Sequence, residues 1–89
     1  LKLKDTYTFV ALENTVPASV ALSDFEWPRL PLLILGEEGV GITPETLALC
    51  DHFVFIPQFG SVRSLNAAVA GSIAMNDFVT KHNKKMLNC

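Results

Sequence analysis

The residues best suited to chemistry lie in one stretch, residues 58–70, which reads QFGSVRSLNAAVA. Gly60 gives the turn conformational freedom, and Ser64 has the hydroxyl expected of a helix N-cap. A turn that runs into a helix presents unpaired backbone N–H groups and the positive end of the helix dipole. The stretch therefore has two interpretations, a ligand-binding loop and an ordinary turn between a strand and a helix.

Three apolar runs of strand length, residues 7–12, 31–35 and 53–56, must position this loop. Continuous apolar runs are typical of strands buried on both faces, as in a parallel sheet. Pro57 should end the third strand at Ile56, because proline cannot donate a hydrogen bond to a neighbouring strand. Ligands of such sheets bind beyond the carboxyl ends of the strands, where residues 58–70 are expected.

Helices are expected between and after the strands. A brief one is predicted near residues 19–24, a short one over residues 43–50, and a long one from the loop to about His82. Thr43 as N-cap and Pro44 at the first helical position favour the second of these. The alternation predicts an α/β fold, a parallel sheet with helices on both faces. Small residues nearly all round the last helix predict that it is enclosed; they are Ala67, Ala68, Ala70, Gly71, Ser72 and Ala74.

The second strand leads into residues 36–41, GEEGVG, whose three glycines allow a close approach of backbone or a positive φ. The segment lacks the lysine of a phosphate loop and the GxGxxG order of a dinucleotide fingerprint. Glu37 and Glu38 are adjacent, so their side chains diverge and do not form a paired acid and base.

Composition excludes several functions. Cys50 and Cys89 lie far apart, and neither the cysteines nor the histidines show metal-ligand spacing, so no metal site and no disulfide framework are expected. No apolar run is long enough to span a membrane. The net charge of −2 provides no general attraction for nucleic acid. The one basic cluster, Lys81, Lys84 and Lys85, is interpreted as a solvated tail, and no secretory signal is visible, which predicts an intracellular, cytoplasmic protein.

Three segments together resemble the SPOUT class of RNA methyltransferases, specifically the SpoU/TrmH type: ALENT, LLILGEEGVGI and FIPQFGSVRSLNAAVAG. The resemblance covers about residues 9–79. It implies an α/β fold with a C-terminal trefoil knot, bound S-adenosylmethionine, methyl transfer to a ribose 2′-hydroxyl of tRNA or rRNA, and a homodimer.

The resemblance also implies roles for individual residues. The positions that match the cofactor site are Leu35, Gly36, Ile56, Gly60 and Leu65. Glu38 matches the family's motif glutamate, and Ser64 and Asn66 match its polar residues; these three are the candidate catalytic residues.

One family feature has no counterpart here. Family members begin with a βα region that contains an asparagine and an arginine, the latter proposed to activate the ribose hydroxyl, and Arg63 is not its equivalent. We therefore expect residues 1–89 to be the C-terminal portion of such a domain, with the N-terminal part missing and no methyl transfer by this segment alone. The alternatives are a non-catalytic cofactor- or RNA-binding module and a dimerisation module.

Overall fold

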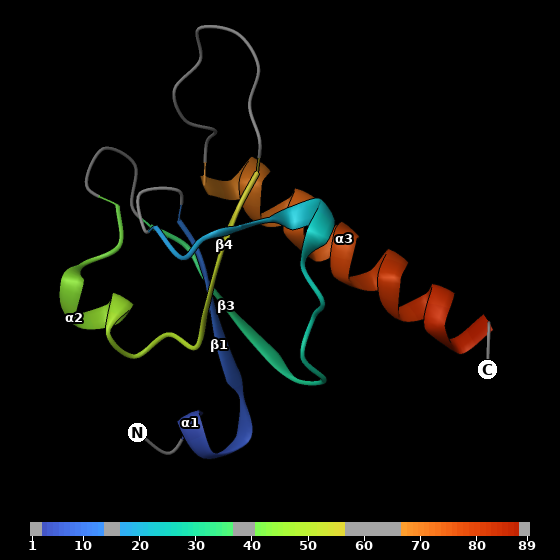
Figure 1. Cartoon of the computed structure of the whole chain (residues 1–89), viewed down its shortest axis with the longest axis horizontal. Coiled ribbons are helices and arrows are strands. Elements are labelled where there is room, and N and C mark those ends of the chain that lie inside the picture. Colours follow the sequence, from blue (N-terminus) through green and yellow to red (C-terminus); the bar gives the residue numbers. More distant parts are fainter. Residues whose placement is uncertain (1–2, 14–16, 37–40, 57–66, 88–89) are drawn as a thin grey trace, which may run out of the picture.

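The computed structural model describes residues 3–13, 17–36, 41–56 and 67–87 (Figure 1). Its elements are, in chain order, α1 (Leu3–Thr6), β1 (Thr8–Leu12), β2 (Val20–Ala21), the 3-10 helix η1 (Leu22–Asp24), β3 (Pro31–Ile34), α2 (Pro44–Leu47), β4 (His52–Phe55) and α3 (Ala67–Leu87).

The strands form one parallel sheet in the order β2-β4-β1-β3. β1 lies between β3 and β4, because Val10 pairs with Leu33 of β3 on one side and with His52 of β4 on the other. The predicted class, a parallel α/β sheet with helices, is confirmed. The predicted knot depends on the chain path through segments that include residues 37–40 and 57–66, which lie outside the described residues, so the knot stays a prediction.

The prediction of a helix near residues 19–24 was wrong in its first half. Val20 and Ala21 instead form β2, a fourth strand, and pair with Val54 and Phe55 of β4. Only residues 22–24 turn helically, as η1. A two-residue strand has no periodicity of its own, so its conformation is set by the free side of β4.

The core lies on both faces of β1. Phe9, Val10 and Ala11 are consecutive and all buried, so side chains pointing to opposite faces are both covered. On one face Val10 and Val54 pack with Leu22 and Phe25 from the β2–β3 connection. The continuous apolar pattern of the first predicted strand is thereby explained.

Trp27 packs the β2–β3 connection against α3. Its indole ring meets the rings of Phe25 and Phe78 edge-on, with centroids 5.0 and 5.6 Å away. Its Nε1–H donates to Oδ2 of Asp77 in α3 at 2.8 Å. One aromatic side chain thus joins the β2–β3 connection to α3 by packing and by a hydrogen bond.

α3 is not enclosed, contrary to the prediction from its small residues. Gly71 and Ala74 are buried, but Val69, Met75 and Val79 are about half exposed. Figure 1 shows α3 running past the sheet, so that its C-terminal turns project from the body of the molecule. Small residues permit close approach on every side, but here they are used on one side only.

At the amino ends of the strands, Asp51 ties β4 to β1. Its Oδ2 accepts hydrogen bonds from Lys4 Nζ at 2.6 Å and from the backbone N–H of Phe9 at 2.8 Å. The Asp51 N–H in turn donates to the Phe9 carbonyl at 2.9 Å. The Lys4 hydrogen bond, and next the Phe9 N–H, lower the pKa of the Asp51 carboxyl below its ordinary value.

We expect Asp51→Asn to lower the free energy of unfolding at neutral pH and to have little effect in acid. A lowered pKa in the folded state means that the carboxylate stabilises the fold above the unfolded-state pKa. That stabilisation is lost as the pH falls through the folded-state pKa. Urea unfolding of wild type and of Asp51→Asn, from neutral pH into acid, measures the difference in their free energies of unfolding. Glu26→Gln, which neutralises an exposed carboxylate, is the control; a difference between Asp51→Asn and wild type that does not shrink in acid would contradict the prediction.

Candidate functional site

The carboxyl ends of the strands meet at one edge of the sheet, here called the carboxyl edge. Ala11 pairs with Ile34 and Leu12 pairs with Val54, so β1, β3 and β4 end close to the same level. The residues that leave the sheet there are Glu13, Leu35 and Ile56. Ligands of parallel α/β sheets bind in this position, which makes the carboxyl edge the candidate site.

Gly36 follows β3 directly, and its backbone lies against the chain that returns from the glycine-rich segment. A β-carbon at Gly36 would lie 2.7 Å from the carbonyl carbon of Gly41 and 2.9 Å from the backbone nitrogen of Ile42. Such distances are too short for any side chain. Gly41 itself has a φ of +78°, in the left-handed region that favours glycine. Two glycines of GEEGVG therefore fold the segment back on itself at the carboxyl edge.

The structure places three of the predicted cofactor residues, Leu35, Gly36 and Ile56, at the carboxyl edge, where they follow β3 and β4, the strands on either side of β1. The Leu35 side chain is 40% exposed and lies against α3, where a β-carbon at Gly71 would be 2.9 Å from its Cδ1. Ile56 packs against the core cluster around Val10 and Val54. A ligand at this edge can therefore meet the main chain of Leu35 and Ile56 and the exposed part of the Leu35 side chain.

The remaining predicted site residues lie outside the described residues: Glu38, Gly60, Ser64, Leu65 and Asn66. Their positions in the chain fix where they connect. Glu38 lies between Gly36 and Gly41, and the other four lie between Ile56, at the end of β4, and Ala67, at the start of α3. Both segments therefore begin at the carboxyl edge.

Sequence reasoning gave Glu13 no individual role, although the structure places it at the same edge. Its N–H donates to the Val54 carbonyl at 2.9 Å, and its carbonyl accepts from the Ser19 hydroxyl at 2.6 Å. Its Oε2 would lie 3.8 Å from a β-carbon at Gly41. Its position directly after an apolar run was the available signal. The side chain of Glu13 therefore lies beside Gly41.

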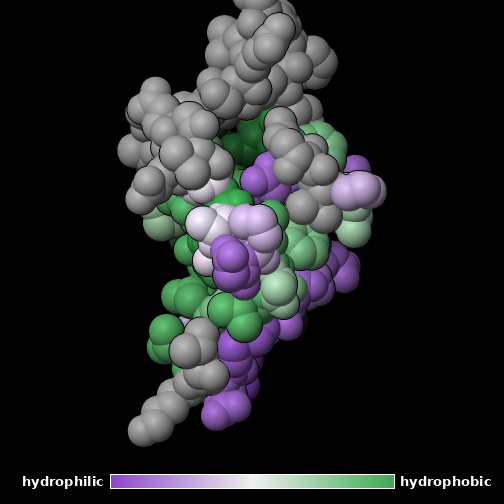
Figure 2. All heavy atoms as spheres, turned by 90° about the vertical axis from the view of Figure 1, so that its left-hand side faces the viewer, coloured by the Kyte–Doolittle hydropathy of each residue, from purple (hydrophilic) through white to green (hydrophobic). Residues whose placement is uncertain are grey.

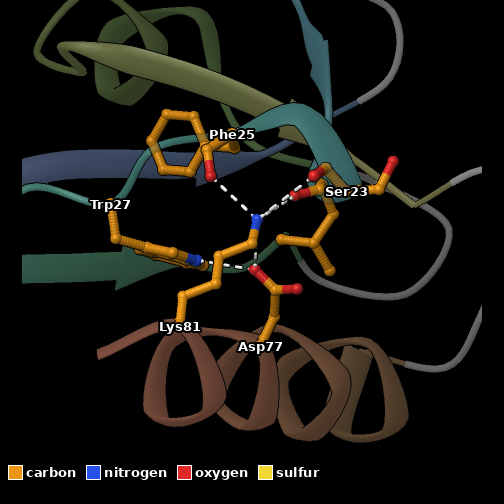
Figure 3. A network of polar contacts seen from close by, with 6 residues as sticks. Ser23, Phe25, Trp27, Asp77 and Lys81 are labelled. Carbon is orange, nitrogen blue, oxygen red and sulfur yellow. Dashed lines mark hydrogen bonds and ion pairs between the residues drawn. The ribbon is translucent and has the colours of Figure 1, made fainter. Parts of the chain in front are cut away.

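The prediction that Lys81 belongs to a solvated tail was wrong. Its Nζ donates to the carbonyl oxygens of Leu22 and Phe25, both at 2.8 Å, and forms an ion pair with Asp77 at 2.9 Å (Figure 3). The i, i+4 spacing of Asp77 and Lys81 was a signal that the sequence offered.

The cysteine and histidine positions give no sign of a metal centre. Cys50 is half-buried, donates to the Thr46 carbonyl at 3.4 Å, and has a pKa raised chiefly by burial. Within residues 3–13, 17–36, 41–56 and 67–87, no three side chains of His, Cys, Asp or Glu gather in a way that could hold a metal ion. No helix in those ranges is long and apolar enough to cross a membrane.

These features define a class of protein: a parallel α/β domain whose glycine-rich segment folds back at the carboxyl edge, beside the start of a long helix. Comparison with known structures narrows the class. An A. aeolicus TrmH/SpoU tRNA modifying enzyme matches with a TM-score of 0.79 and 25% identity, over 93% of this chain and 42% of that one. The SpoU methyltransferase AviRb of Streptomyces viridochromogenes, solved with the cofactor AdoMet, matches with a TM-score of 0.76 and 29% identity, over 88% of this chain and 30% of that one.

Sequence comparison agrees with the structural comparison. The chain is 32% identical to a tRNA (guanosine(18)-2'-O)-methyltransferase of Saccharomyces cerevisiae over 91% of its own length, which is 6% of the yeast protein. The SpoU rRNA Methylase family matches residues 1–76. The chain belongs to that family, and it spans less than half the length of each of these relatives.

We expect Gly36→Ala to destabilise the protein by about 2 kcal/mol or more, because its methyl group would meet backbone that cannot move aside. Gly71→Ala is the matched control. Its methyl group would meet only the flexible tip of Leu35, and alanine favours the helix by about 1 kcal/mol, so the net change should be small. Urea unfolding of both variants decides the matter. Equal losses of unfolding free energy in the two variants would show that the contact with Gly41 and Ile42 is not what requires glycine at position 36.

Proposed function

We propose that this chain is part of an S-adenosylmethionine-dependent methyltransferase that modifies a ribose 2′-hydroxyl of tRNA or rRNA. The observation that carries the proposal is the joint position of Leu35, Gly36 and Ile56 at the carboxyl edge of a SpoU family chain, where the two segments with the remaining predicted site residues begin. The AdoMet bound to AviRb and the tRNA substrate named for the yeast relative support the choice of cofactor and substrate class.

The described residues fit such a cofactor by the chemistry of their main chain. Where a strand has ended, N–H and carbonyl groups no longer pair with a neighbouring strand, and a nucleoside with many polar atoms can use them. In this proposal Leu35, Gly36, Ile56, Gly60 and Leu65 hold the cofactor, which supplies the methyl group.

A 2′-hydroxyl is a weak acid, so its proton must be removed or the developing negative charge stabilised. Glu38, Ser64 and Asn66 are the candidate residues for that task.

We also propose that residues 1–89 form the C-terminal portion of the methyltransferase domain. The structural matches support a partial domain, since nearly all of this chain aligns with 42% and 30% of the two solved chains. Activation of the ribose by an arginine outside this sequence, as the family resemblance implies, is part of the proposal. We further propose that the protein needs no metal, does not insert into a membrane and meets its RNA in the cytoplasm.

The test of the cofactor site is isothermal titration of the whole protein with S-adenosylmethionine. Wild type should bind, and Gly36→Val should abolish binding, because a branched side chain at this position would displace the Gly41–Ile42 backbone and with it the wall of the site.

Radiolabelled methyl transfer to tRNA and rRNA then measures activity. Asn66→Ala should bind the cofactor nearly as wild type does but turn over about 100-fold more slowly. A wild-type protein that binds no S-adenosylmethionine would refute the proposal.

We propose a homodimer whose contact is the outward side of α3, defined by Val69, Ile73, Met75 and Val79. These four side chains are 39–57% exposed. Between residues 69 and 80 the only charged side chain is Asp77, which turns inward to Trp27, so the outward side of α3 is uncharged over three turns. Hydrophobic side chains also remain at the surface in the view from the α2 side (Figure 2). Exposed Ser72, Asn76 and Thr80 lie between these apolar side chains, so the outward side of α3 is uncharged and mixed in polarity. An exposed helix side without charges that carries several apolar side chains is typical of a surface covered by a protein partner.

Ile73→Lys combined with Val79→Lys should convert the dimer to a monomer, because each lysine would place a charge in an apolar contact. Sedimentation equilibrium measures the change as a halved molar mass. Leu49→Lys introduces a lysine at an exposed leucine outside α3 and should leave the mass unchanged. A wild-type protein that is monomeric at the concentrations of the assay would contradict the proposal.

A further inference from the structure

α3 makes a series of contacts along one side, and each contact falls on a different part of the domain. Gly71 receives the side chain of Leu35, Ala74 is fully buried, Asp77 accepts from Trp27, and Lys81 reaches the end of η1. The spacing of three or four residues keeps these positions on one side of the helix. Contacts at both ends of this series prevent the helix from sliding along its axis and from rotating about it.

The contact at Lys81 is polar and highly directional. An ammonium group has three hydrogen atoms to donate, and here Asp77, the Leu22 carbonyl and the Phe25 carbonyl lie 2.8–2.9 Å from Nζ. The Ser23 carbonyl lies further away, at 3.4 Å. Figure 3 shows Asp77 and Lys81 rising side by side from α3 towards the connection that carries Phe25 and Trp27. Because Asp77 also accepts a hydrogen bond from Trp27, Lys81 and Trp27 share one carboxylate oxygen.

The helix α3 connects the Lys81 contact to the proposed cofactor residues. Gly71 and Lys81 are ten residues apart, which is about 15 Å of helix. At the Gly71 end α3 contacts Leu35, and its first residue follows directly on the segment that contains Gly60, Ser64, Leu65 and Asn66. A shift of α3 along its axis would therefore move the end of that segment and remove the support of Leu35 together.

We propose that Lys81, together with Asp77, is a positioning pair for the cofactor site: by fixing α3 against the end of η1, it sets the place of Leu35. The inference rests on the proposed function, since it concerns the affinity for S-adenosylmethionine. Lys81 does not touch the cofactor; it acts through the position of the helix. A displacement of binding groups by about 1 Å suffices to change function by orders of magnitude.

The test is the dissociation constant of S-adenosylmethionine, measured by isothermal titration of the whole protein at a temperature at which every variant is folded. Lys81→Met keeps the aliphatic stem but loses the donors, and should weaken binding about tenfold or more. Lys81→Arg, which can still donate to carbonyls and carboxylate, should recover most of the affinity. Asp77→Asn tests the other half of the pair and decides the matter if Lys81→Met does not fold.

Two controls separate positioning from general stability. Lys84→Met removes the same charge from an exposed position of the same helix and should leave the affinity within about twofold of wild type. Asp51→Asn loosens the amino ends of the strands, and it too should leave the affinity unchanged while the protein is folded. The inference is overturned if Lys81→Met binds as tightly as wild type, or if Asp51→Asn weakens binding as much. A wild-type protein that does not bind overturns the proposed function itself.

Discussion

The parallel pairing of β1 with strands on both sides is the constraint on which the rest of the structure depends. β3 and β4 come from distant parts of the chain, yet each pairs with β1 in register, so all three end at one edge. Parallel pairing brings together residues that are 20 or more positions apart in sequence: Glu13, Leu35 and Ile56. It also places backbone groups with unused hydrogen-bonding capacity next to each other. A site made largely of main chain needs this arrangement more than it needs particular side chains.

The two edges of the sheet are held by different interactions. At the amino ends, Asp51 accepts from the Phe9 N–H of β1 and forms an exposed ion pair with Lys4 of α1. At the carboxyl edge the contacts are close approaches of backbone, Gly36 against Gly41 and Ile42, with no side chain between them. An ion pair thus contributes at the amino ends, while at the carboxyl edge the lack of a side chain at Gly36 lets the Gly41–Ile42 backbone pack against it.

α3 serves two purposes because its two sides differ in chemistry. The inner side combines small residues, which admit Leu35 and the sheet, with Asp77 and Lys81, which bond to the β2–β3 connection. The outer side carries apolar residues of ordinary size that this chain does not cover. Composition alone suggested a helix surrounded on all sides. Only the position of the sheet distinguishes the inner side of α3 from its outer side.

The sequence by itself determined the α/β class, the three longer strands within a residue or two, and the segments that surround the site. Apolar runs, prolines and glycines express local backbone preferences, and these preferences were strong enough to place Leu35, Gly36 and Ile56 at strand ends. The tertiary structure alone decided that Val20 and Ala21 form a strand, that Lys81 is an internal anchor rather than part of a tail, and that Gly36 is required by backbone crowding. Each of these depends on a partner 20 or more residues away, or on a chain reversal, and such partners leave no periodic trace in the local sequence.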